Sequence, residues 1–165
     1  ALAQPVVMST RRKQFVPRVL AITAGSAVRF PNEDPILHNA FSTSAENAFD
    51  TGQYGRGDGR TQVFSKPGLV RVYCNVHHSM FGFLLVLDTP FFARTDAVGR
   101  FRLDGLPEGD GELVVFHDRG APLKQQVTVT KGSVIDLKLD LNKRRVPAHT
   151  NKFGKPYART PNANY

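Results

Sequence analysis

The stretch Tyr73-Cys74-Asn75-Val76-His77-His78-Ser79-Met80 holds an unusual share of the soft donor atoms in this 165-residue chain. It contains the single cysteine, two of the five histidines and one of the two methionines. A thiolate, an imidazole and a thioether together suit copper better than they suit any hard cation. Their spacing, Cys-x-x-His-x-x-Met, lets one strand-to-strand loop wrap all three donors around a single ion. Such a site needs one more donor from elsewhere in the chain.

Strand patterns lie on both sides of this loop and extend upstream of it. Residues 69–73 run directly into Cys74, and the apolar run 83–87 predicts a central strand buried on both faces. Further strands are expected at 4–8 on an edge, 15–22 with an interruption at Pro17, 27–30 and 61–65. The proline-flanked residues 31–35 predict a loop, and the glycine-rich residues 42–60 predict a long connection. The lack of helical periodicity in 1–88 predicts an all-β sandwich.

Asp88-Thr89-Pro90 marks a boundary between two domains. Five short strands are expected beyond it, at 91–94, 99–103, 111–117, 124–130 and 133–141. We therefore predict a first domain at 1–89 and a small second β-sandwich at 90–141, near the lower size limit for an independent core. Residues 142–165 contain three prolines and few aliphatic side chains, which predicts an extended basic tail.

The net charge of +8 comes from the two ends of the chain. Residues 1–20 carry four basic residues and no acidic one, and residues 142–165 carry six basic residues and no acidic one. A basic tail can bind nucleic acid, anionic lipid or an acidic protein, or it can simply be solvated. The few aromatic residues in the tail speak against nucleic acid. No apolar run reaches the roughly 20 residues that span a bilayer. Because the chain begins with Ala1, we expect an export signal to have been removed.

His38 is the candidate for the missing imidazole, because it lies 36 residues before Cys74 and follows the strand expected at 27–30. His38-Asn39 together with Cys74-x-x-His77-x-x-Met80 resembles the ligand set of cupredoxins, the type 1 blue copper proteins. The short loop spacing is most similar to that of amicyanin, and the resemblance covers residues 1–88. Residues 90–141 resemble small transthyretin-like or carboxypeptidase-regulatory-like β-sandwiches. The tandem resembles exported cupredoxin-like proteins labelled as methylamine-utilisation proteins.

This resemblance implies a Greek-key cupredoxin sandwich in which His38, Cys74, His77 and Met80 bind copper, while Asn39 pins the ligand loop by hydrogen bonding. Alternatives remain for single positions. His78 is a less favoured ligand than His77, Glu33 could supply an axial oxygen, Met8 is a remote alternative, and Met80 could be a core residue only. Zinc also binds imidazole and thiolate, but a zinc site would leave Met80 unexplained.

The resemblance implies a periplasmic or otherwise exported bacterial protein that carries single electrons between redox partners, and acidic redox proteins are among the partners expected. The alternative is a copper-binding protein for sequestration, tolerance or delivery, and a third possibility is a structural or adhesion module. We expect no enzyme, since the sequence has no Ser/His/Asp order or spaced carboxylate pair for hydrolysis. The oligomeric state does not follow from the sequence.

Overall fold

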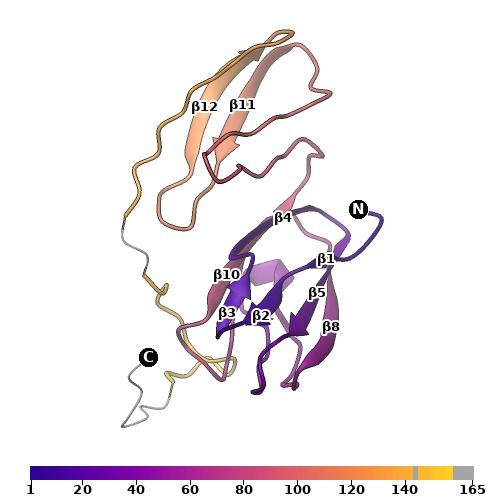
Figure 1. Cartoon of the computed structure of the whole chain (residues 1–165), viewed down its shortest axis with the longest axis vertical. Coiled ribbons are helices and arrows are strands. Elements are labelled where there is room, and N and C mark those ends of the chain that lie inside the picture. Colours follow the sequence, from indigo (N-terminus) through magenta and orange to yellow (C-terminus); the bar gives the residue numbers. More distant parts are fainter. Residues whose placement is uncertain (143–144, 158–165) are drawn as a thin grey trace. The chain divides into compact units, whose positions relative to one another are not determined.

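The computed structural model describes residues 1–142 and 145–157 and consists of β-strands, turns and one short 3-10 helix, η1 (Ala45–Asn47). The chain divides into two compact units (Figure 1). The first unit contains Ala1–Asp88 and the C-terminal segment that starts at Val146, and the second runs from Thr89 to Arg145. Within the described residues, no helix has the length and apolar character needed to cross a membrane.

The first sheet is built on β5 (Ser26–Asn32), which alternates between buried and half-buried residues. Along one edge of β5 lie β1 (Val6–Val7) and then β2 (Ser9–Arg11), both parallel to it. β3 (Gln14–Val16) pairs with β2, and β8 (Gly57–Phe64) pairs with the other edge of β5, in both cases antiparallel.

The second sheet has the strand order β4-β10-β9-β6-β7. β10 (Phe81–Leu87) lies between β4 (Val19–Thr23), which is parallel to it, and β9 (Gly68–Tyr73), which is antiparallel. Two short strands, β6 (Phe41–Ser42) and β7 (Phe49–Asp50), complete the sheet. Most of β10 is buried, as expected for an apolar strand with a neighbour on each side. The prediction of a central strand here is confirmed.

Both sheets contribute to one hydrophobic cluster. Phe30 and Phe64 come from the first sheet, and Val72 and Leu84 come from the second. Cys74 belongs to the same cluster, and so does Met80, so the loop between β9 and β10 is anchored in the core of the first unit. Side chains buried in such a cluster contribute about 1.5–3 kcal/mol each to stability. The position of the loop is therefore fixed by the packing of the sandwich.

Two predictions for the first unit are wrong in detail. Pro31 was expected to begin a loop, but β5 continues to Asn32, and the register with β8 shifts between Phe30 and Asn32. A bulge of this kind accommodates a residue without a backbone N–H. The connection expected at 42–60 contains η1, β7 and the start of β8. Gly59 allows this early start, because it has φ +70° and a Cβ there would collide with the carbonyl of Phe30.

In the described part of the second unit, strands form only at β11 (Gly109–Val115) and β12 (Leu123–Val129), which make a two-stranded antiparallel sheet. The strands expected at 91–94, 99–103 and 133–141 are not assigned as strands. Their residues are mostly exposed and few large apolar side chains are buried, so little core is available to hold a third or fourth strand. The resemblance of this unit to a small sandwich is not confirmed.

The C-terminal tail has neither helix nor strand over its described residues 145–157. Of its six basic residues, Lys143, Arg144 and Arg159 lie outside the described residues. The segment from Val146 to Tyr157 belongs to the first unit, and its contacts with the loop after β9 are described below.

Candidate metal centre

The loop between β9 and β10 closes on itself through backbone hydrogen bonds. Tyr73 and Phe81 pair across the two antiparallel strands, so the loop enters and leaves at one point. The N–H of Cys74 donates to the carbonyl of Met80 over 3.4 Å, and the N–H of Met80 donates to the carbonyl of His77 over 3.0 Å. The strands and these two bonds fix where the donor side chains emerge.

His38 lies in the segment just before β6, the strand that pairs with β9. It forms an isolated antiparallel bridge with Tyr54, in which the two residues exchange hydrogen bonds of 3.1 and 2.9 Å. Its side chain is completely buried. The ring therefore occupies one position in the end of the core rather than sampling solvent.

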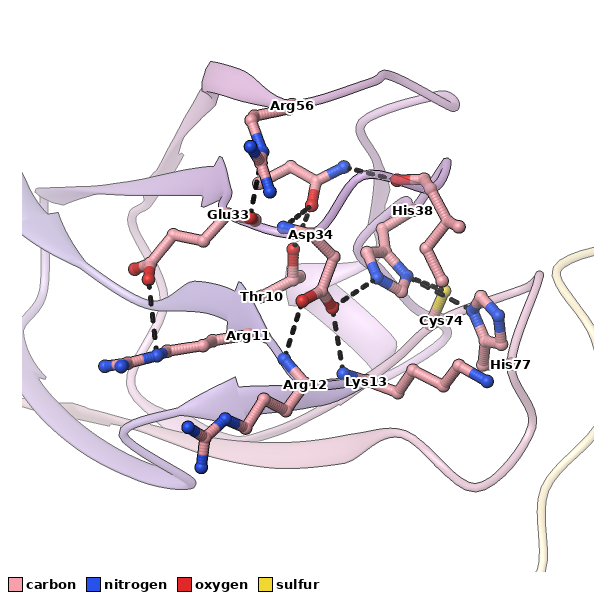
Figure 2. Close-up of polar contacts among 12 residues, drawn as sticks. Thr10, Arg11, Arg12, Lys13, Glu33, Asp34, His38, Arg56, Cys74 and His77 are labelled. Carbon is pink, nitrogen blue, oxygen red and sulfur yellow. Dashed lines mark hydrogen bonds and ion pairs between the residues drawn. The ribbon is translucent and has the colours of Figure 1, made fainter.

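Three of the predicted ligands converge on one point. The Nδ1 atoms of His38 and His77 are 3.2 Å apart, and Nδ1 of His38 is 3.7 Å from Sγ of Cys74. Potential ligand atoms of all three residues lie within 4.8 Å of one another. Figure 2 shows the His38 ring facing Cys74 and His77 on one side and Asp34 on the other. Cys74 and His38 are buried and His77 is half-buried, so the cluster lies close to the surface at its His77 edge.

The His77 ring is held in the form that can bind a metal. Burial lowers the pKa of His77, and the neighbouring His38 ring and the Lys13 ammonium lower it further. Figure 2 shows the Lys13 side chain extending toward His77. A metal binds the unprotonated ring nitrogen, so a lowered pKa keeps the lone pair available at neutral pH.

Asp34 orients His38. Its Oδ2 is 2.9 Å from Nε2 of His38, and its carboxylate also accepts the backbone N–H groups of Arg12 and Lys13 over 2.7 and 2.8 Å. Burial raises the pKa of Asp34, but the hydrogen bonds from Lys13, His38 and Arg12 outweigh it and hold the pKa below its usual value. An ionised carboxylate at Nε2 keeps the proton on that nitrogen and leaves Nδ1 free to face Cys74.

Asn39 connects the two halves of the centre. Its Oδ1 accepts the N–H of Asn75 over 2.7 Å, and its Nδ2 donates to Asp50 over 3.0 Å. Asn39 follows His38 and Asn75 follows Cys74, so this one side chain ties together the two segments that carry buried donors. This geometry supports the predicted role of Asn39 in pinning the loop.

The remaining predicted residues take different places. Met80 is buried in the same apolar cluster as Cys74. His78 is exposed, and its ring centroid lies 5.7 Å from that of Tyr157. Glu33 lies at the surface, where its carboxylate is 3.7 Å from Nε of Arg11 and points away from the cluster (Figure 2). Met8 is buried beside Gly82 in the core.

Comparison with known proteins found similar solved structures, each of which matches part of the chain. No family model matches the chain, and no curated protein does. Solved structures do match, and the three described here have TM-scores between 0.45 and 0.49. The Cu-containing nitrite reductase of Thermus scotoductus SA-01 is 29% identical with a TM-score of 0.49, and the match covers 52% of this chain but only 23% of the reductase. The structural neighbours are cupredoxins.

Two smaller proteins are among these neighbours. The purple cupredoxin of Nitrosopumilus maritimus is 22% identical with a TM-score of 0.45, covering 50% of this chain and 99% of that protein. Amicyanin from Paracoccus versutus is 22% identical with a TM-score of 0.48, covering 53% of this chain and 85% of that protein.

The chemistry of the donor set itself points to copper. Two imidazoles and one thiolate are the in-plane donors of blue copper sites, which add a weak axial sulfur. Structural zinc sites close a tetrahedron with four strong donors. Among the described residues, the cluster of His, Cys, Asp and Glu donor atoms contains only His38, Cys74 and His77. Met80 adds a buried thioether to the apolar cluster that contains Cys74, and a soft sulfur donor suits copper better than zinc.

Several supporting residues were not identified from the sequence. Asp34 was assigned to a loop, although its spacing of four residues from His38 could have suggested a carboxylate partner for a ligand histidine. Asp50 acts through its carboxylate, Asn75 acts through its backbone N–H and its side chain, and no sequence motif marks either residue. Lys152 contacts Asn75 across 77 residues, and His149 stacks on Tyr73.

Proposed function

We propose that this chain carries single electrons through a copper ion that His38, Cys74 and His77 would hold, with the thioether of Met80 as a weak fourth donor. The observation that carries the proposal is the convergence of two imidazole nitrogens and one buried thiol sulfur within 4.8 Å. Copper would supply the one-electron couple. The sandwich would hold the same donor geometry for both oxidation states, so that little reorganisation accompanies transfer.

The half-buried His77 ring gives electrons their shortest route to the surface. Ile36, Leu37 and Val76 expose apolar surface in the segments that carry His38 and His77. A redox protein that docks on such a surface would exclude water between the two redox centres, and the basic Lys13 would favour an acidic partner protein.

We propose no chemical transformation of a substrate. Export to the periplasm remains the predicted location.

Reversible redox chemistry separates the carrier from its alternative, a protein that sequesters or delivers copper. In an electrochemical titration, the copper-loaded protein should gain and lose one electron per chain without releasing the metal. Loss of copper on each reduction would instead support storage or delivery. The same titration tests Met80, because Met80→Leu conserves volume while removing the sulfur. A potential unchanged by Met80→Leu would remove Met80 from the ligand set.

A further inference from the structure

The C-terminal segment carries contacts that neither the fold nor the ligand set explains. Residues 149–157, called the C-terminal clasp below, form a tight turn of their own. The Asn151 side chain accepts the backbone N–H groups of Phe153 and Lys155, and the Asn151 N–H donates to the Lys155 carbonyl. Gly154 allows the turn with φ +73°. The clasp therefore has a defined local shape although it has no helix or strand.

The clasp binds the loop that carries the thiol. The N–H of Lys152 donates to Oδ1 of Asn75 over 3.0 Å, and the hydroxyl of Tyr157 donates to the carbonyl of Cys74 over 3.3 Å. The ring of His149 stacks on that of Tyr73 with centroids 3.8 Å apart and planes 6° from parallel. Three consecutive residues, 73 to 75, are thus each held by a different clasp side chain or backbone group.

These contacts close a ring that also includes the His38 segment. The ammonium of Lys152 donates to Asp50 over 2.7 Å, Asp50 accepts Nδ2 of Asn39 over 3.0 Å, and Asn39 accepts the N–H of Asn75 over 2.7 Å. The backbone bond from Lys152 to Asn75 completes the cycle. Lys152 and Asp50 are about three-quarters and two-thirds buried, so solvent screens their attraction less than it screens an exposed pair.

We infer that the C-terminal clasp is a working part of the metal centre, in which Lys152 and Tyr157 are positioning residues that hold the Cys74 loop against the His38 segment. None of the clasp residues belongs to the ligand set. We expect these residues to make the loop more rigid in the metal-free protein and to slow dissociation of the bound metal. Residues that orient metal ligands typically alter metal affinity by about 10–100-fold when they are replaced.

The inference rests on the proposed function for its effect on copper, but the clasp itself can be tested in the metal-free protein. The measurement is amide hydrogen exchange at Asn75, whose N–H donates to Asn39, with the release of Cu²⁺ to a chelator as a second readout. Lys152→Met should raise both rates by about tenfold or more. Lys152→Arg keeps a cation opposite Asp50 and should restore most of the protection.

Lys155→Met is the matched control, since it removes the same charge from an exposed position in the same turn and should leave both rates unchanged. Tyr157→Phe removes only the hydroxyl bonded to Cys74 and should raise the exchange rate at Asn75. Equal exchange and release for Lys152→Met and Lys155→Met would overturn the inference. A protein that bound no copper would contradict the proposed function instead, and the exchange rates would still decide whether the clasp holds the loop.

Discussion

At the scale of single residues, the contact between Asp34 and His38 determines which nitrogen of His38 is available to a metal. The carboxylate accepts two backbone N–H groups from a two-residue turn, Arg12-Lys13, whose φ angles of 51° and 56° are unusual for residues other than glycine. The turn of the β2–β3 hairpin thus donates two backbone hydrogen bonds to the Asp34 carboxylate, and this carboxylate in turn contacts Nε2 of His38. If His38 binds copper as proposed, the charge on this carboxylate makes the ring a stronger donor to the metal.

Asp34→Asn should therefore raise the reduction potential of the copper-loaded protein. Asn keeps an acceptor for Nε2 of His38 but removes the negative charge, and weaker donation destabilises Cu²⁺ relative to Cu⁺. Each tenfold change in that preference corresponds to about 60 mV. Cyclic voltammetry measures the shift. Glu33→Gln, which changes an exposed neighbouring carboxylate paired with Arg11, should leave the potential almost unchanged. A shift of equal size in both variants, or none in Asp34→Asn, would contradict this role.

At the scale of elements, the pairing of β5 with β8 brings Tyr54 and the His38 bridge to the end of the core. The hydroxyl of Tyr54 donates to the carbonyl of Phe30 over 2.6 Å, and burial raises the pKa of Tyr54 to about 12. The bulge in β5 and the glycine opposite it allow this close approach. The position of His38 in the candidate metal centre is therefore linked, through its bridge to Tyr54, to the irregular part of β5.

Gly59→Ala should destabilise the metal-free protein by about 2 kcal/mol. The new methyl group would meet the backbone of Phe30, and the positive φ at this position disfavours any side chain. Urea denaturation followed by circular dichroism gives the free energy of unfolding. Gly55→Ala is the control, because its Cβ would meet only Leu37 at ordinary contact distance. Equal stability of the two variants would show that the bulge does not require glycine.

The ligand loop could be predicted from the sequence because its donors are neighbours in the chain. Cys74 and His77 lie on one loop, and alternation and turn signals placed strands on both sides of it. His38 was found through its spacing from Cys74. The extension of β5 through Pro31 was not predictable in the same way, because a bulge depends on the partner strand and on Gly59. Tertiary pairing overrides the local rule that proline ends a strand.

At the scale of the whole molecule, the C-terminal segment returns to the first unit after the whole of the second unit has intervened. Composition predicts an extended basic tail, but it cannot predict that Lys152 would meet Asp50 across 102 residues. Such contacts arise only once the sandwich has brought Asp50 beside Asn75. The two-stranded sheet of the second unit shows the same limit, since regular strand signals there are not matched by enough buried apolar surface.

His149 should make the stability of the metal-free protein depend on pH. Burial lowers the pKa of His149 below its usual 6.5, although the hydrogen bond to the Pro147 carbonyl opposes this, and nearby His78 lowers it further. Nδ1 faces that carbonyl, and the buried Nε2 has no hydrogen-bond partner among the described residues, so protonation would leave a buried N–H without an acceptor there. Because the pKa of His149 is lower in the folded protein than in the unfolded chain, neutral His149 contributes to the free energy of unfolding above pH 6.5. This contribution is lost as the pH falls through the lowered pKa of the folded state.

The test compares the free energy of unfolding at about pH 8 and about pH 5 for the metal-free wild type and for His149→Phe. Phenylalanine can stack on Tyr73 and Tyr157 but cannot titrate, so the variant should lose less stability between the two pH values. Other histidines, His77 among them, add to the pH dependence of both proteins and cancel in the comparison. An identical loss in the two proteins would show that His149 does not couple the clasp to pH.

The visible absorption spectrum of the fully Cu²⁺-loaded protein tests the central claim most directly. If His38, Cys74 and His77 bind one copper ion as proposed, charge transfer from the Cys74 thiolate to Cu²⁺ should give an intense visible band. That band should disappear on reduction, return on oxidation, and be missing from Cys74→Ser loaded to the same copper content. A wild-type protein that holds one oxidised copper ion per chain without an intense visible band would contradict the account.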